Sequence, residues 1–324
     1  MLFLSWIAVP SLVPPPPVLL LDGGSKRAGA TLSLRSAAAQ LSQQLGGRDV
    51  RPVSVRWSDE VPAEELDGVP ARTLAAELTS LATAGTQRAV VAPLFLGPSD
   101  AINNGLEACI DALTADGLAM DIHLAECLVA SQQPDDHRVA RALAALVLRL
   151  ARTRRLEGPL KVRDAAPWLP AFVDLQLIEL HPPCPQVVLV DHGTPSVRVN
   201  DVRCRLEHEL RTLLGDRAAV VAAASMERRP DPRYDFNEPL LESLLGTPPF
   251  DSGDVIVAMA FLSPGRHAGA GGDIDAILAD ARAGHPALRT HTTPLLASQS
   301  LVSRVLGDRV AAAEALEPRY SSVL

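Results

Sequence analysis

Two histidines stand where an imidazole can do chemistry. His192 directly follows the apolar run 186–191, and His267 lies in a glycine-containing segment, 263–272. Neutral imidazole binds first-row divalent metals, and its pKa near neutrality also lets it accept a proton. The pair therefore indicates a site for metal binding and proton transfer. Glu227, which follows a second apolar run, is a candidate catalytic base or hard ligand beside it.

The residues next to the histidines are of types that bind anions. Gly193 and Thr194 follow His192, and Arg266 precedes His267. The glycines Gly271 and Gly272 lead into a helical pattern, for which we expect Asp273 as the N-cap and Gly284 at the end. Backbone N–H groups at a helix start bind anions, so we expect these residues to bind an anionic group of the ligand.

Each of these residues also has an ordinary interpretation. His192 can be a turn histidine bonded to backbone, and His267 a solvated surface residue. Glu227 precedes two arginines and can form a surface ion pair. The glycine cluster can be a plain connector, and Cys204 and His208, four apart on a predicted helix, are too few for a zinc site.

The same order of elements occurs twice in the chain. An apolar run, a turn containing Asp-X-Gly-Ser/Thr and a helical pattern begin at Val18 and again at Gln186. Without a gap, five residues of the first copy fall on identical residues of the second: Asp22, Gly24, Leu45, Gly46 and Arg48 on Asp191, Gly193, Leu214, Gly215 and Arg217. Repetition of this kind is the signature of a duplicated unit.

Further along the chain, the two copies differ where the chemistry lies. After a small shift Glu60 pairs with Glu227, and Phe95, Leu96 and Pro98 pair with Phe261, Leu262 and Pro264. The two histidines have no partner of their own kind, because Gly23 stands opposite His192 and Ala101 opposite His267. Asp191 can orient a neighbouring imidazole, but its recurrence as Asp22 in the copy without histidines favours a structural role in the turn.

Strands that alternate with helices predict an α/β protein of two lobes, each with a mainly parallel sheet. We expect a first lobe at 17–150, a connector at 151–185 and a second lobe at 186–324; an amphipathic helix covers about 132–157. Ligands of such sheets bind at the carboxyl ends of the strands, where the segments carrying both histidines emerge. The two lobes are expected to form one cleft.

Composition excludes several classes of function. The 324 residues carry a net charge of −8 and only 3% aromatic residues, which argues against nucleic acid as a partner. Four cysteines without a CxxC pair predict a cytoplasmic protein. The opening residues MLFLSWIAVPSLV have no preceding Lys or Arg and are followed by prolines, so we expect neither a signal peptide nor a membrane span.

Three motifs together resemble those of the class II tetrapyrrole chelatases, the sirohydrochlorin cobaltochelatase and ferrochelatase family. They are VLVDHGT with Asn200 downstream, ASMERRP, and AFLSPGRHAGAGGDI. The resemblance implies two tandem chelatase-like three-layer lobes, with His192 and His267 as catalytic and metal-binding residues. It also implies an ATP-independent lyase of cobalamin or siroheme biosynthesis, which inserts cobalt or ferrous iron into a tetrapyrrole without an organic cofactor. We expect a monomer.

Two departures from the family pattern bear on function. The interval between the second histidine and its Asp-Ile is longer here, and the first lobe lacks both histidines, so we expect it to form a wall without catalysis. A non-catalytic tetrapyrrole or metal carrier with the same cleft is the alternative. A nucleotide-binding module ranks below both, because neither GxGxxG nor a P-loop follows either strand.

Overall fold

The computed structural model of the chain describes residues 14–99, 101–130, 133–156 and 184–321. The N-terminal stretch considered as a signal peptide and most of the predicted connector lie outside these residues. No helix among the described residues has the length and apolar character needed to cross a bilayer.

Residues of the first repeat form a four-stranded parallel sheet, and those of the second form another. The first has the order β2-β1-β3-β4, with β1 at Val18–Asp22, β2 at Val50–Ser54, β3 at Arg88–Pro93 and β4 at Asp121–Leu124. The second has the order β6-β5-β7-β8, with β5 at Gln186–Asp191, β6 at Val220–Ser225, β7 at Gly253–Met259 and β8 at Leu288–Thr292. We call the two halves the N-lobe and the C-lobe. The predicted α/β fold with parallel sheets is confirmed.

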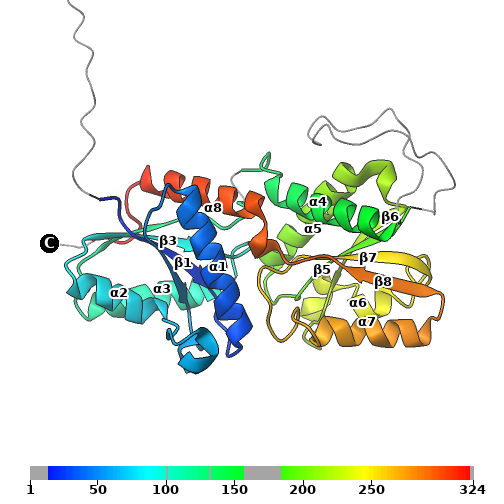
Figure 1. The fold of residues 1–324 in the computed structure, drawn as a ribbon, viewed down its shortest axis with the longest axis horizontal. Coiled ribbons are helices and arrows are strands. Elements are labelled where there is room, and N and C mark those ends of the chain that lie inside the picture. The colour runs from blue at the N-terminus through cyan, green and yellow to red at the C-terminus, as the bar shows by residue number, and fades with distance from the viewer. Residues whose placement is uncertain (1–13, 100, 131–132, 157–183, 322–324) are drawn as a thin grey trace, which may run out of the picture.

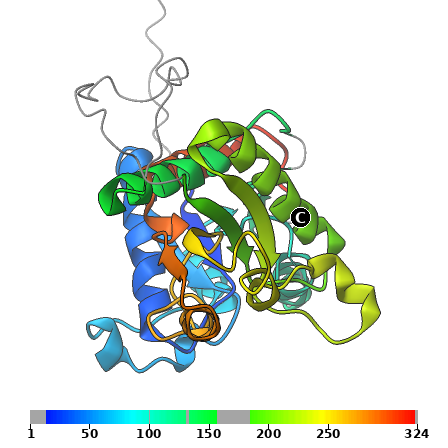
Figure 2. The ribbon, with the colours of Figure 1, turned by 90° about the vertical axis from the view of Figure 1, so that its right-hand side faces the viewer.

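Helices cover both faces of each sheet and make three layers in each lobe (Figures 1 and 2). The N-lobe contributes α1 (Ala28–Gln44), α2 (Leu74–Thr83) and α3 (Glu107–Ala115), and the C-lobe α5 (Val197–Leu214), α6 (Leu241–Leu244) and α7 (Asp273–Gly284). Short helical segments lie at Ser58–Glu60, Ala63–Leu66, Ala101–Leu106, Gly215–Arg217, Pro232–Asn237 and Leu296–Ser298. The central strands β1 and β5 are apolar at successive positions because both of their faces are buried.

The last helix of each half packs on the other half. Helix α4 (Arg138–Arg154) follows the N-lobe strands but packs against α5 and β7, whereas α8 (Ser300–Glu314) follows the C-lobe strands and packs against α1 and β3. One hydrophobic core consequently contains buried residues of both lobes, among them Leu34, Leu143, Leu210 and Val305. The predicted boundary after residue 150 falls inside α4, so neither half has its full set of covering helices without the other.

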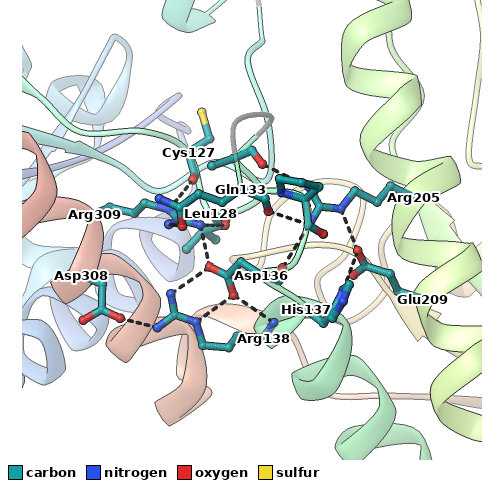
Figure 3. Close-up of polar contacts among 12 residues, drawn as sticks. Cys127, Leu128, Gln133, Asp136, His137, Arg138, Arg205, Glu209, Asp308 and Arg309 are labelled. Atoms are coloured by element: carbon teal, nitrogen blue, oxygen red, sulfur yellow. Dashed lines mark hydrogen bonds and ion pairs between the residues drawn. The ribbon is translucent and has the colours of Figure 1, made fainter.

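Two arginines hold the crossover segment that precedes α4 (Figure 3). Arg309 of α8 is only 2% exposed, and its guanidinium donates to the carbonyls of Cys127 and Leu128 and, at 2.8 Å, to the Asp136 carboxylate. Arg205 of α5 donates to the carbonyls of Ala130 and Asp136, each at 3.1 Å. Because these arginines come from different helices of the second repeat, they join the two lobes at this segment.

Candidate functional site

A tight turn at the end of β5 places His192 at the carboxyl edge of the second sheet. Gly193 has a φ of +90°, and a Cβ atom there would lie 1.9 Å from the Glu227 carbonyl oxygen. The Gly193 N–H donates to the Asp191 carboxylate at 3.1 Å, and the Glu227 N–H donates to the His192 carbonyl at 3.2 Å. Only glycine fits this close approach of two backbones, and it brings His192 and Glu227 side by side.

The Asp191 carboxylate serves this turn rather than an imidazole. It accepts hydrogen bonds from Gly193 and Ser225, and burial raises its pKa. In the N-lobe, Asp22 accepts from Gly24 at 2.9 Å and from Ser54 Oγ at 2.6 Å, and burial raises its pKa as well. Because the same arrangement occurs beside Gly23, where there is no histidine, it supports the structural interpretation of Asp191.

The loop after β7 brings His267 to His192. The centroids of the two imidazole rings are 4.4 Å apart, with 40° between the ring planes. His267 Nδ1 lies 2.6 Å from Asp273 Oδ2. An Nδ1–H donated to this carboxylate puts the ring's lone pair on Nε2, so the contact selects the tautomer that can bind a metal or accept a proton through Nε2. Among the described residues, the only donor near Nε2 is the exposed Arg266 guanidinium, at 3.5 Å.

Asp273 therefore has a different position and contact from those expected. The N-cap of α7 is Gly272, whereas Asp273 is the first residue of the helix and turns its carboxylate to His267. Gly284 is the last helical residue, and the C-cap is His285. The prediction of Asp273 as N-cap was wrong because a carboxylate at a helix start has the same sequence signature whether it caps the helix or binds a neighbouring side chain. The sequence signal for the contact with His267 was the spacing of six residues between His267 and Asp273 across a glycine-rich loop.

A second carboxylate, that of Glu227, contacts a ring nitrogen of His192. His192 Nε2 is 3.1 Å from Glu227 Oε1, and these side chains are 48% and 57% exposed. The site thus contains two histidine–carboxylate pairs, His192–Glu227 and His267–Asp273, with the rings facing each other. Each pair can take up one proton, because a carboxylate stabilises the imidazolium that forms.

The surroundings of His192 favour its neutral form. Partial desolvation of the half-exposed ring is the main cause that lowers the pKa of His192 below its ordinary 6.5, and the positive charge of a protonated His267 lowers it further. The charges of Glu227 and Asp191 act in the opposite direction, but the net shift is downward. The imidazole of His192 therefore keeps its lone pair at neutral pH and is ready to bind a cation or to accept a proton.

The donor set suits transient binding of a metal. Among the described residues, no group of three or more His, Cys, Asp or Glu side chains is arranged to hold a metal ion. His192 and His267 supply two nitrogens, and water or an incoming ligand would have to complete the coordination of a first-row ion. Such a site can accept a metal and release it again.

Most residues expected to bind carboxylates already use their N–H groups within the protein. Thr194 donates its N–H to Asn237 Oδ1 at 2.9 Å, and Gly271 donates to Asp275 Oδ2 at 2.8 Å. The Gly272 N–H donates to the Gly269 carbonyl. The exposed guanidinium of Arg266, whose Nη2 lies 3.5 Å from His267 Nε2, has donors to spare. Of the expected anion-binding residues, Arg266 has the freest donors, and the roles of the others stay predictions.

Cys204 and His208 lie on α5, as the sequence indicated. The Cys204 thiol is contacted at 3.7 Å by the amide of the buried Asn200. Neither residue belongs to a metal-binding group among the residues described.

The N-lobe counterpart of Glu227 is Arg56. A Cβ on Gly24, which has a φ of +86°, would lie 1.7 Å from the Arg56 carbonyl oxygen, as one on Gly193 would lie against Glu227. Strand pairing agrees, because Asp22 pairs with Ser54 and Asp191 with Ser225, each two residues earlier. The alignment of Glu60 with Glu227 was therefore wrong. Glu60 instead pairs with Lys26 at 2.6 Å.

The two lobes touch beside the histidine pair. Arg27, just before α1, donates to the carbonyl of Gly265 at 3.4 Å, and Ser33 Oγ lies 3.3 Å from Ser263 Oγ. The segment that carries His267 thus packs against the first turns of an N-lobe helix.

Comparison with known proteins identifies the fold. No protein-family model and no curated protein matches the sequence. Among solved structures, SirB from Bacillus subtilis with Fe3+ has a TM-score of 0.61 at 12% identity, covering 94% of this chain and 98% of that one. The sirohydrochlorin chelatase SirB from B. subtilis subspecies spizizenii in complex with cobalt has a TM-score of 0.58 at 12% identity, covering 92% and 94%.

A third structure, DR2241 from Deinococcus radiodurans, is a multi-domain protein with structural similarity to chelatases. Its TM-score is 0.51 at 16% identity, over 91% of this chain and 54% of that one. These likenesses concern the fold: the chain has a class II chelatase-like fold of two α/β lobes.

Proposed function

We propose that this protein is an ATP-independent chelatase that inserts a divalent metal, cobalt or ferrous iron, into sirohydrochlorin or a related tetrapyrrole. The observation that carries the proposal is the facing pair His192 and His267, each with a carboxylate on its ring, at the carboxyl edge of the second sheet. The likeness of the fold to SirB, whose structures are described with Fe3+ and with cobalt, supports the same activity.

The proposed reaction exchanges one metal ion for two protons. The ion arrives hydrated and first binds the free nitrogens of His192 and His267, which displace part of its water. It then passes to the ring nitrogens, and the two pyrrole N–H groups release their protons. Each imidazole that gives up the metal regains a lone pair and accepts one of these protons, so charge and atoms balance.

The two carboxylates help the imidazoles to take up the protons and then to release them to solvent. Asp273 holds the His267 ring by Nδ1, which leaves Nε2 as the nitrogen that would bind the ion and accept the proton. Glu227 lies on His192 and stabilises the imidazolium after the proton is taken up. Both carboxylates are about half exposed, which gives the protons a route to solvent. The site needs no organic cofactor for this chemistry.

Among the described residues no third side chain is arranged with the two imidazoles to hold a metal ion, which supports a metal in transit over a stored one. A tetrapyrrole or metal carrier, the alternative function, gains from ligands that retain its cargo, whereas insertion requires the ion to leave the protein for the ring.

The proposal is tested by an anaerobic absorbance assay with sirohydrochlorin and cobalt or ferrous iron, run beside His192→Ala. We expect rapid spectral conversion by the wild-type protein and a rate near the uncatalysed one for the variant. Tight ring binding without faster insertion would instead identify a carrier.

A further inference from the structure

The N-lobe copy of the site carries the opposite charge. Arg56 has the backbone position of Glu227, and its side chain is exposed. Within the described part of the chain, no carboxylate forms an ion pair with it. Where the C-lobe places an anion next to His192, the N-lobe places a cation at the end of a strand that lacks a histidine. A guanidinium at this position disfavours a divalent metal and can bind an anion.

A stacked tryptophan orients the Arg56 guanidinium. Its Cζ lies 4.1 Å from the centroid of the Trp57 ring. Trp57 is 42% exposed and has a φ of +68°, a conformation that costs a bulky residue free energy. Arg228, at the corresponding position of the C-lobe, is not among the described non-glycine residues with positive φ. The unusual backbone is thus confined to the copy with the arginine.

The contact with the ring leaves N–H donors of the guanidinium available. A guanidinium over an aromatic ring keeps N–H donors in its own plane, where they can bind both oxygens of a carboxylate. An exposed tryptophan also offers apolar area against which the rim of a flat macrocycle can pack.

The Arg56 loop and the His267 loop border the same short segment, residues 23–27. Gly24 at one end contacts the Arg56 carbonyl, and Arg27 at the other end donates to Gly265, two residues before His267. Arg27 also has no carboxylate partner among the described residues, whereas Lys26 between them is neutralised by Glu60. Among the described residues, Arg27 and Arg56 thus both lack a carboxylate partner, and both border the N-lobe segment that contacts the His267 loop.

Resting on the proposed function, we propose that Arg56, oriented by Trp57, binds a peripheral carboxylate of the tetrapyrrole. Arg27 contributes a second cation, and together they hold the ring against His192 and His267. On a protein of net charge −8, local cations such as these favour the binding of a polycarboxylate at this place. In this proposal the C-lobe binds the metal and the N-lobe binds the ring.

The test measures ring binding without metal, so that chemistry does not enter. Uroporphyrin, a macrocycle with eight carboxylates, is titrated with the full-length wild-type protein and with Arg56→Gln, and binding is followed by the fluorescence of the macrocycle. The matched control is Arg88→Gln. Arg88 is an exposed arginine at the amino end of β3, whereas Arg56 follows the carboxyl end of β2 in the same sheet. Uroporphyrin octamethyl ester reports on the ring without charged carboxylates.

We expect Arg56→Gln to weaken uroporphyrin binding about tenfold, as loss of a charged hydrogen bond does, and Arg88→Gln to bind like the wild type. Arg56→Lys retains the charge and should recover part of the loss. With the ester, wild type and Arg56→Gln should bind alike. Unchanged uroporphyrin affinity in Arg56→Gln, or an equal loss with the ester, would overturn the proposal.

Insertion assays separate this inference from the proposed function. If wild-type protein inserts metal through His192 while Arg56→Gln binds the ring normally, the inference fails and the function stands. If uroporphyrin binding depends on Arg56 but no metal is inserted, the ring-binding role stands and the chelatase function fails.

Discussion

The carbonyl oxygens of Glu227 and Arg56 occupy equivalent places in the two lobes, each against a glycine with a φ near +90°. The backbone of the turn is thus the same in both copies, while the side chain changes from an anion beside a histidine to a cation without one. The same turn backbone therefore carries two chemically different side chains. Gly24 and Gly193 allow this turn because no other residue fits so close to the carbonyl oxygen.

The first prediction concerns these two glycines. Gly193→Ala and Gly24→Ala should each lower the free energy of unfolding by about 2 kcal/mol or more, because a Cβ would meet a carbonyl oxygen and the backbone is left-handed. Urea denaturation measures the change. Gly284→Ala is the control: its Cβ meets nothing within 4 Å, so stability should be unchanged or slightly raised. Equal stability of all three variants would contradict the close approach.

A second prediction assigns Asp273 as the positioning residue for His267. Asp273→Asn should reduce metal insertion about 10- to 100-fold, because the amide no longer stabilises the imidazolium or selects the Nδ1–H tautomer. Asp280→Asn, an exposed position on the same helix, should insert metal at the wild-type rate. The tautomer itself can be read from the imidazole 15N shifts of His267. An Nε2–H form in the wild-type protein would disprove the assignment.

The third prediction is a pH dependence. NMR titration of the metal-free protein should give His192 a pKa below 6.5, because partial desolvation and then the charge of His267 disfavour its protonated form. Since the pKa is lower in the folded than in the unfolded state, stability contributed by this group is lost as the pH falls below 6.5.

Two variants should move this pKa in opposite directions. His267→Ala removes the repelling charge and should raise the pKa of His192, whereas Glu227→Gln removes an attracting charge and should lower it. Shifts of the same sign in both variants would show that the electrostatic assignment is wrong.

A fourth prediction tests the lost site. A Cβ on Gly23 has no neighbour closer than 3.9 Å, so Gly23→His should fold. It should not create a second metal site, because Arg56 stands where Glu227 stands in the C-lobe, and a guanidinium repels the cation. Cobalt titration followed by absorbance measures the stoichiometry. A second equivalent of cobalt bound by this single variant would contradict the charge inversion.

Much of the fold could be predicted from the sequence because buried parallel strands leave continuous apolar runs, and these recur with Asp22 and Asp191 at their ends. The exchange of α4 and α8 between the lobes could not be predicted. An amphipathic helix has the same periodicity whichever sheet its apolar face covers, so the pattern does not name its partner. Arg309, which holds the crossover, likewise looks like any helical arginine until its carbonyl acceptors are known.

For the candidate site, the location of both histidines after apolar runs predicted that they lie at the carboxyl ends of strands. It did not predict which carboxylates contact them. The contact of Asp273 with His267 depends on how the glycine-rich loop folds back. The pairing of Glu60 with Glu227 failed because residue identity was followed across a gap, whereas strand pairing places Arg56 there. Charge inversion between copies is invisible to a comparison that rewards identical residues.

The central claim, that His192 and His267 pass a metal to a tetrapyrrole, is tested most directly by the rate of metal insertion into sirohydrochlorin under anaerobic conditions. The wild-type protein should convert the spectrum with cobalt or ferrous iron, while His192→Ala and His267→Ala, with unchanged unfolding midpoints, should fall at least about 100-fold. Wild-type rates in both single variants would contradict the account.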